Sequence, residues 1–192
     1  MSLTINHQTN DISATSGSVT IGGAAVGGGG GGALELVTHT VTSSSATSVI
    51  FDNLNDDYVT YRLMMDWVLS SQQNSYPNLR FYDGSTALTN YTTHRSATNN
   101  QNTSSSQSEI NLVYETSSYY FNSIVNIWGI GLTNKPIQVS AVTNSSTSAN
   151  SLVDVGAYRA ATNVTPDKIE IRATWSNIPA GARFTLYGLK SS

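Results

Sequence analysis

The 192-residue chain contains no cysteine, which excludes disulfide bonds and metal sites built on thiolate ligands. Charge is also scarce, because only 11% of the residues are charged and the net charge is −3, whereas about a quarter of a typical domain is charged. The few lysines and arginines are spread along the chain, so nucleic acid is not an expected partner. No apolar run approaches the roughly 18 residues of a membrane-spanning helix, and Met1 to His7 lack the features of a secretory signal. A membrane partner and export are therefore not expected.

Motifs for catalysis are missing as well. No serine lies in a Gly-x-Ser-x-Gly turn, and the six glycines from Gly27 to Gly32 are not followed by the Lys-Ser/Thr of a phosphate loop. Two acidic residues have an arginine close by on the same strand face, namely Asp66 with Arg62 and Glu170 with Arg172. We interpret these as surface charge pairs and not as catalytic acids. The sequence predicts that the protein is not an enzyme.

Metal and cofactor sites are not expected either. The three histidines, His7, His39 and His94, lie in different segments without a partner at ligand spacing. The segment from Asp52 to Asp57 resembles a calcium loop in its oxygen-bearing residues, but Tyr58 stands where such a loop turns on glycine. A turn between two strands is the favoured interpretation of this segment. No metal and no cofactor is predicted.

Composition divides the chain into an arm and a domain. Residues 1–33 have almost no large side chains and end in the glycine run, so they cannot form a core of their own. We expect them to be an anchoring arm that gains order by adding short strands to a neighbouring subunit. Its β-prone anchor residues are Leu3, Ile5, Ile12, Val19 and Ile21. Residues 34–192 are long enough to form one domain with a hydrophobic core.

In this second part the apolar residues recur with a period of two, the spacing of half-buried β-strands. The segment Val59–Leu69 places every second residue on an apolar face, and Lys168–Trp175 repeats the pattern. The segment 119–130 is less regular and leaves room for a turn of helix. An all-β, antiparallel two-sheet sandwich follows, with a jelly roll preferred over an immunoglobulin-like sandwich. The other expected strands are Leu34–Thr42, Ser48–Phe51, Leu79–Tyr82, Leu88–His94, Glu109–Glu115, Ser123–Ile130, Ile137–Thr143, Leu152–Arg159 and Ala182–Leu189.

Aromatic side chains are the remaining candidates for contact with a ligand or a sister subunit. Trp67 and Trp175 fall on apolar strand faces and are expected in the core. Several others lie in or near polar segments, where contact residues are common. These candidates for glycan or subunit contact are Tyr76, Tyr91, Tyr119, Tyr120, Phe121 and Trp128. Burial in the core or in a subunit contact is the alternative, and is preferred for the cluster at 119–121.

Four patches of sequence carry a resemblance to known proteins, from Asn10 to Gly23, from Val49 to Leu54, from Tyr58 to Leu63 and from Ile178 to Lys190. They resemble segments of tailed-bacteriophage virion proteins. The segment from Asn10 to Gly23 is similar to the short-strand repeats of phage fibre and appendage proteins. The ending from Ile178 to Lys190 contains Gly-x-Arg-Phe-x-Leu-Tyr-Gly, which resembles the last strand of a jelly-roll-like domain in a loosely defined group of these proteins. Two earlier strands match in layout, from Val49 to Leu54 and from Tyr58 to Leu63.

The resemblance implies a structural role on the virion surface after assembly in the bacterial cytoplasm. The expected protein is a head decoration or short fibre protein, and the alternative is a tail-fibre or receptor-binding module that recognises a host-surface glycan. The expected partners are further copies of the chain, as a homotrimer or another small multimer, and other virion proteins such as the major capsid protein or tail components. No catalytic residue is implied by the resemblance.

Overall fold

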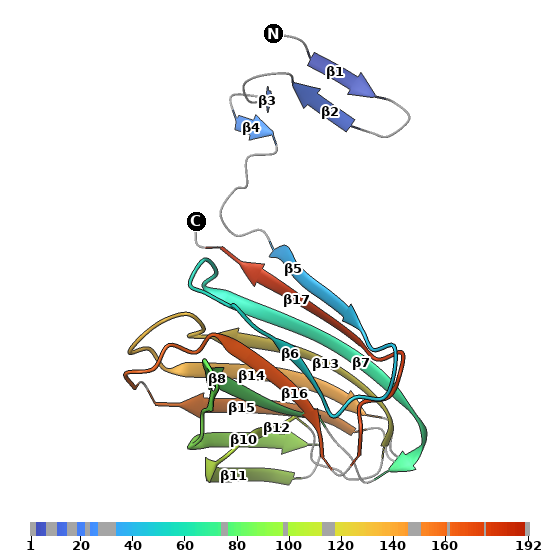
Figure 1. The fold of residues 1–192 in the computed structure, drawn as a ribbon, viewed down its shortest axis with the longest axis vertical. Helices are drawn as coiled ribbons and strands as arrows, with labels where there is room; N and C mark the ends of the chain where they lie inside the picture. The colour runs from blue at the N-terminus through green and yellow to red at the C-terminus, as the bar shows by residue number, and fades with distance from the viewer. Residues whose placement is uncertain are drawn as a thin grey trace. The chain divides into compact units, whose positions relative to one another are not determined.

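The computed structural model describes residues 3–6, 11–14, 19–21, 24–26, 34–73, 77–97, 100–112, 118–145, 151–160, 162–174 and 176–190. The chain separates into two compact units, residues 1–33 and residues 34–191. All regular elements in the described ranges are β-strands (Figure 1). Accordingly, this part of the chain has no helix with the length and hydropathy needed to cross a membrane.

The first unit contains two short antiparallel hairpins. Strand β1 (Leu3–Asn6) pairs with β2 (Asp11–Ala14), and β3 (Val19–Ile21) pairs with β4 (Ala24–Val26). All five anchor residues predicted from the sequence lie on these strands, and Ile5 is directly opposite Ile12. The side chains of this unit lie outside the described part of the structure, so their role as anchors stays a prediction.

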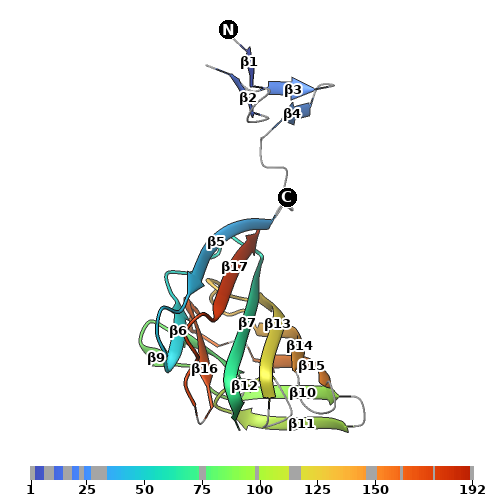
Figure 2. The same cartoon turned by 90° about the vertical axis from the view of Figure 1, so that its right-hand side faces the viewer.

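The second unit is a sandwich of two antiparallel sheets, which confirms the predicted fold class. The larger sheet has the strand order β11-β10-β15-β14-β13-β7-β17-β5, and the smaller has the order β12-β8-β16-β6 with β9 added beside β8. Figure 2 shows the two sheets from the side as two layers. The bounds are β5 (Leu34–Val41), β6 (Ser48–Phe51), β7 (Thr60–Gln73), β8 (Pro77–Asp83), β9 (Thr86–Ala87), β10 (Tyr91–Ala97), β11 (Asn100–Gln107), β12 (Ile110–Asn111), β13 (Ser118–Trp128), β14 (Ile137–Ser145), β15 (Ser151–Arg159), β16 (Lys168–Ala173) and β17 (Arg183–Leu189).

Eight strands of the sandwich pair in a nested order. The first pairs with the last, β5 with β17, and the next pairs inside it are β6 with β16, β7 with β13 and β8 with β12. Two hairpins are inserted into this scheme, β10–β11 after β8 and β14–β15 after β13. Both extend the larger sheet beyond β13, because β14 pairs with β13 and β15 pairs with β10.

The core lies between the two sheets and follows the predicted alternation. On β7 the side chains of Tyr61, Leu63 and Met65 are buried, and on β16 those of Ile169 and Ile171 are fully buried. Successive residues of a strand point to opposite faces, so each strand presents every second side chain to the opposing layer. The hydrophobic effect on these faces is the main force that holds the layers together. Trp67 and Trp175, also expected in the core, have side chains outside the described part.

Several features of the strands differ from the prediction. The polar segment 100–107, which is not among the expected strands, is the edge strand β11. The segment 119–130, which left room for a turn of helix, is extended up to Trp128 in β13. Strand β10 begins only at Tyr91, three residues later than expected. Edge strands need no apolar face, because their backbone hydrogen bonds alone can hold them to a neighbour.

Candidate functional site

A groove of about 430 Å³ lies on the outer face of the larger sheet, over β14, β15, β10 and β11. These are the strands of the two inserted hairpins, at the end of the larger sheet away from β5 (Figure 1). The volume falls within the range of about 300–1,000 Å³ that is usual for small-molecule sites. The groove is therefore built on strands that the nested pairing of the sandwich does not require.

Strand register arranges the outward side chains of this region in three parallel rows. The middle row runs from Ser140 through Gly156 and His94 to Thr103, because each of these residues is directly opposite the next. A neighbouring row runs from Val142 through Asp154 and Ser96 to Gln101, and the row on the other side contains Gln138 and Tyr158. Along a strand, adjacent rows are two residues or about 6.7 Å apart.

Gly156 forms the floor of the groove. A Cβ atom added at this position would meet no atom within 4 Å, so the missing side chain leaves open space between Ser140 and His94. A glycine weakens the interior of a strand, and it often marks a bulge, a bend or a place where a ligand or another backbone approaches closely. In the sequence, Gly156 is the single glycine of an otherwise regular strand pattern from Leu152 to Arg159. This was the signal that could have indicated the groove.

The ring of His94 is fixed on one side of the floor. Its Nδ1 atom lies 2.8 Å from Oγ1 of Thr103 on the neighbouring edge strand. This hydrogen bond restricts rotation of the imidazole and leaves Nε2 as the ring's second hydrogen-bonding atom. Most of the other polar lining comes from hydroxyl and amide groups, which are both donors and acceptors.

The same outer face carries exposed apolar side chains beside the groove. Met64, Ile124 and Val142 are direct cross-strand neighbours on β7, β13 and β14, and each is between 41% and 44% exposed. Trp128 and Tyr158 flank Gln138 from the two neighbouring strands and are 37% and 47% exposed. Cross-strand neighbours of this kind form one continuous surface.

Two of the aromatic residues predicted as contact candidates are in the core instead. Tyr91 is fully buried and Phe121 is 2% exposed, so neither ring is available at the surface of the folded chain. Both lie on the inward faces of their strands, β10 and β13, although polar residues flank them in the sequence. This corrects the contact-surface expectation for Tyr91 and Phe121, and agrees with the preferred alternative for Phe121.

The remaining candidates have different outcomes. Trp128 is on the outer face of β13, as a contact residue must be. Tyr120 is half-buried at the beginning of the described side chains of β13. The backbone of Tyr119 belongs to β13, but its side chain and the whole of Tyr76 lie outside the described part of the structure.

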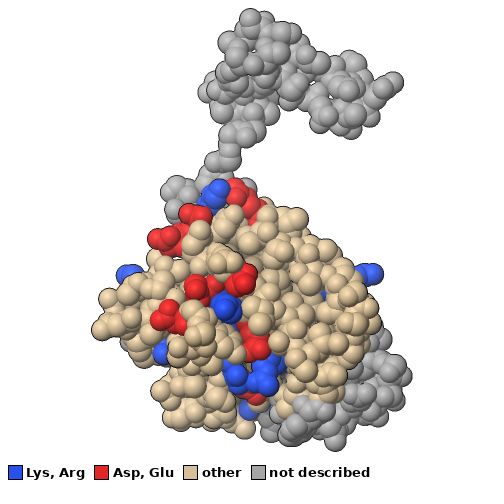
Figure 3. Space-filling model, in the orientation of Figure 1, with Lys and Arg blue, Asp and Glu red and all other residues tan. Residues whose placement is uncertain are grey.

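The outer face of the smaller sheet has a different chemistry, because charged side chains meet there (Figure 3). Arg80 lies 3.3 Å from Glu109, and Arg172 lies 3.9 Å from the same carboxylate. The hydroxyl of Tyr82 donates a hydrogen bond to Glu170 at 2.6 Å. Burial and this bond raise the pKa of Tyr82. The predicted pairing of Glu170 with Arg172 is therefore wrong, because Arg172 is paired with Glu109 and Glu170 with Tyr82.

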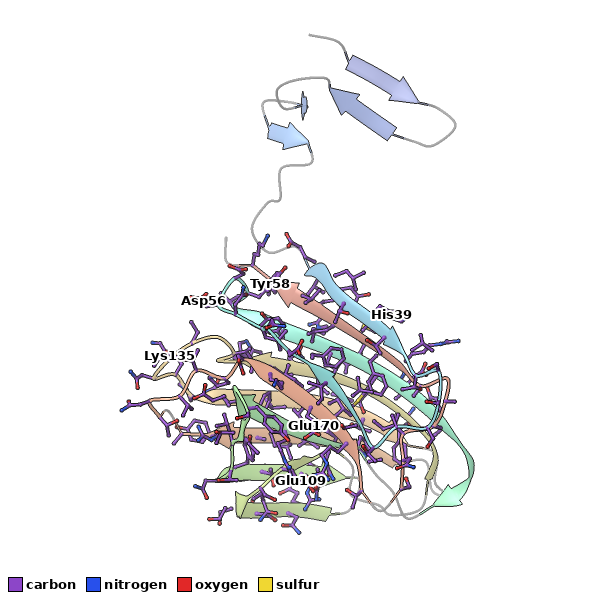
Figure 4. The ribbon with its side chains drawn as sticks, in the orientation of Figure 1. His39, Asp56, Tyr58, Glu109, Lys135 and Glu170 are labelled. Atoms are coloured by element: carbon purple, nitrogen blue, oxygen red, sulfur yellow. The ribbon has the colours of Figure 1, made fainter. Side chains whose placement is uncertain are left out.

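A second charged cluster lies where the first and last strands of the sandwich, β5 and β17, meet. Lys190 contacts Glu35 at 2.9 Å and lowers the pKa of that carboxyl by hydrogen bonding. Tyr58 donates a hydrogen bond to the same carboxylate at 3.3 Å, and Figure 4 shows Tyr58 near Asp56 in the connection before β7. The neighbouring segment 52–57 connects β6 with β7, as the turn interpretation predicts. Within the described residues, no three His, Asp or Glu side chains converge as metal ligands.

Arg62, predicted to pair with Asp66, contacts an asparagine instead. Nε of Arg62 donates a hydrogen bond to Oδ1 of Asn126 on the adjacent strand at 2.8 Å. His39, which carried no predicted role, is exposed and contacts Thr185 across the β5–β17 pair at 2.8 Å. The contact with Asn126 joins the neighbouring strands β7 and β13 on the outer face of the larger sheet.

Comparisons with protein-family models, with curated proteins and with solved structures found no match to the chain. The class that the fold itself defines is an antiparallel β-sandwich with two inserted hairpins.

Proposed function

We propose that the protein is a structural component of a tailed-phage virion, an accessory head decoration or short fibre protein. In this proposal residues 1–33 anchor the chain to the particle and residues 34–192 display the sandwich at its surface. The observation that supports it is the separation of the chain into two compact units at this boundary. The described hydrophobic core lies entirely within the second unit.

The proposal includes a jelly-roll topology for the sandwich. The nested pairs β5–β17, β6–β16, β7–β13 and β8–β12 are the order expected when a single long hairpin is wrapped into two sheets. An immunoglobulin-like sandwich follows a different pairing, with its first strands in one sheet and its middle strands in the other.

Self-association belongs to the same proposal. The exposed row of Met64, Ile124 and Val142 offers an uncharged apolar surface on a sheet face, and such surfaces are frequent at subunit contacts. Copies of the chain form a homotrimer or another small multimer in this proposal. The major capsid protein or tail components are the further partners.

The test combines the location on the particle with the oligomeric state. Antibody labelling of intact virions from the parent phage is expected to mark the head uniformly and at high copy number. Light scattering on the purified full-length chain is expected to give the mass of a small multimer. Absence of the label from purified virions would refute the virion assignment, and label confined to the tail tip would favour the alternative function.

The alternative function is recognition of a host-surface glycan by a tail-fibre or receptor-binding module. One specific observation favours it, which is the polar groove on the outer face of the larger sheet. A sheet face with an open, hydroxyl-lined depression is suited to a ligand that itself presents many hydroxyl groups.

A further inference from the structure

We propose that the groove over β14, β15, β10 and β11 binds an uncharged saccharide, with Gly156 as its floor and Asp154 and His94 as its main hydrogen-bonding groups. This inference deepens the alternative function and rests on it for its biological meaning. It does not depend on the structural role, because a decoration protein and a fibre protein can both carry such a site.

The shape of the groove follows from one residue. Gly156 lies between Ser140 on one neighbouring strand and His94 on the other, and no atom occupies the place where its side chain would be. Asp154 and Tyr158 lie two residues to either side of it on the same face of β15, so their Cα atoms are about 13 Å apart. A flat ring can therefore reach the backbone of β15 between them.

The polar groups of the groove suit hydroxyl recognition. The exposed carboxylate of Asp154 accepts hydrogen bonds, and His94, held by Thr103, keeps one ring nitrogen for a ligand. Ser96, Gln101 and Ser140 add groups that donate and accept. A saccharide hydroxyl also donates and accepts, so each of these groups can be matched, and a hydrogen bond to a charged carboxylate is stronger than one between neutral groups.

The charge of the lining selects against other ligand classes. Among the lining residues that the structure describes, Asp154 is the only carboxylate, and the one arginine, Arg95, is on the inward-facing set of β10 with Tyr91 and Thr93. The described outward side chains of the lining thus present no fixed positive charge to a phosphate or a sulfate. A neutral ligand meets a hydrogen-bonding surface, whereas an anionic ligand is repelled by Asp154.

Tyr158 lies outside the lining of the groove, beside Gly156, and extends the proposed site with an apolar surface. It is 47% exposed, two residues from Gly156 on the same face of β15. The C–H face of a sugar ring is apolar and packs against aromatic rings, which provide large contact areas at low entropic cost. Gly156, the polar groups of Asp154 and His94, and the ring of Tyr158 then contact different faces of one ligand.

The test uses the full-length chain on a printed array of oligosaccharides. The array presents neutral glucose, galactose, mannose, rhamnose and N-acetylhexosamine oligomers beside sialylated and sulfated ones. We expect binding to neutral members, and the neutral oligosaccharide with the strongest signal is then titrated by calorimetry. Binding to none of them, or to sialylated and sulfated members alone, would overturn the inference.

Variants locate the site. Gly156→Tyr fills the floor, and because the added side chain starts in open space on a strand, its thermal midpoint should not fall. Asp154→Ala removes the carboxylate and is expected to weaken binding about tenfold, the equivalent of one charged hydrogen bond. The matched control is Ile50→Tyr, which adds the same ring to an exposed strand position on the smaller sheet. Unchanged binding by Gly156→Tyr would show that the saccharide binds elsewhere.

The same variants separate this inference from the proposed structural function. Multimer mass and incorporation into particles are measured for Gly156→Tyr beside its saccharide affinity. Loss of saccharide binding with normal incorporation supports the site and leaves the structural role intact. If the wild-type chain is incorporated but binds no saccharide, the inference is wrong while the structural proposal stands.

Discussion

The phenol group of Tyr91 is buried inside the sandwich, so its ionisation is coupled to the free energy of unfolding. The residue is fully buried, its hydroxyl accepts a hydrogen bond from the Phe81 backbone N–H at 3.3 Å, and the two rings pack 6.1 Å apart. Burial disfavours the charged phenolate and raises the pKa of Tyr91 to about 12. The folded state therefore binds this proton more tightly than the unfolded chain does.

The predicted consequence is a loss of stability in alkali. The contribution of Tyr91 is fully present below about pH 10, where a tyrosine of the unfolded chain ionises, and is lost as the pH rises to about 12. A difference of about two pKa units corresponds to about 2.7 kcal/mol. Urea unfolding at a series of pH values across this window should show the decline.

Tyr91→Phe should be less stable at neutral pH, since the Phe81 N–H loses its acceptor, and its stability should decline less across the same alkaline window. An equal decline in both proteins would contradict this account.

Single residues also mark the limit of inference from the sequence. The inward position of Leu63 and Ile171 could be predicted, because alternation on a long strand gives their face directly. The burial of Tyr91 could not, since its neighbours Thr89 and Asn90 are polar and β10 begins at the tyrosine itself. The opposing sheet decides the burial of such a residue. Conversely, Gly156 was visible in the sequence, but its place between Ser140 and His94 depends on a register that a single strand cannot reveal.

At the scale of elements, β13 and β14 are joined by a buried pair of hydroxyl groups. Oγ of Ser123 and Oγ1 of Thr143 are 2.8 Å apart, and both residues are directly opposite each other with almost no exposed surface. A hydroxyl buried without a partner costs about 1–3 kcal/mol, whereas replacing both partners by apolar groups is close to neutral. The pair therefore sets register more than it adds stability.

A double-mutant cycle tests this interpretation. Ser123→Ala and Thr143→Val are each expected to lower the free energy of unfolding by about 1–2 kcal/mol, because each leaves the other residue's buried hydroxyl without its hydrogen-bond partner. The double variant should lose clearly less than the sum of the two single losses. The measurement is chemical denaturation of the four proteins under one condition. Additive losses would mean that the two hydroxyls do not depend on each other.

Elements with an apolar face could be predicted and elements without one could not. Strands β6, β14 and β17 agree closely with the expected segments, since each has apolar residues at every second position along one face. Strand β11 consists of Asn, Gln, Ser and Thr and has no apolar face, so its composition is the same as that of a loop. Its place at the sheet edge beside β10 comes from backbone pairing, which leaves no trace in the hydropathy pattern. This strand provides Gln101 and Thr103 of the candidate groove, so that side of the site was also hidden.

At the scale of the whole molecule, sequence spacing predicts most of the segments that form strands but not which of them pair. The nested pairs join segments far apart in the chain, such as Leu34–Val41 with Arg183–Leu189. The insertions that build the groove are ordinary strands in the sequence, and only their pairing through β15 and β10 identifies them as an extension of one sheet. Long-range pairing of this kind is decided by the packing of the two layers as a unit.

The division into two units leads to the last prediction, removal of residues 1–33. The described core runs from Val49 to Leu186, and β5 begins at Leu34 with its pairing to β17 complete inside the second unit. The truncated chain should therefore fold, with a thermal midpoint within a few degrees of the full-length protein, since no core contact is removed. Circular dichroism during heating measures this.

If the arm is the anchor, the same truncation should abolish incorporation into particles. Short β-prone segments such as β1 and β3 gain hydrogen bonds by adding to a neighbour's sheet, and a folded domain without them has no equivalent attachment. The measurement is the amount of truncated protein in virions purified after complementation of a deletion phage, with the full-length chain as control. A folded truncated protein at normal occupancy would transfer the anchoring role from the arm to the sandwich, and the exposed row of Met64, Ile124 and Val142 would then be the first surface to substitute.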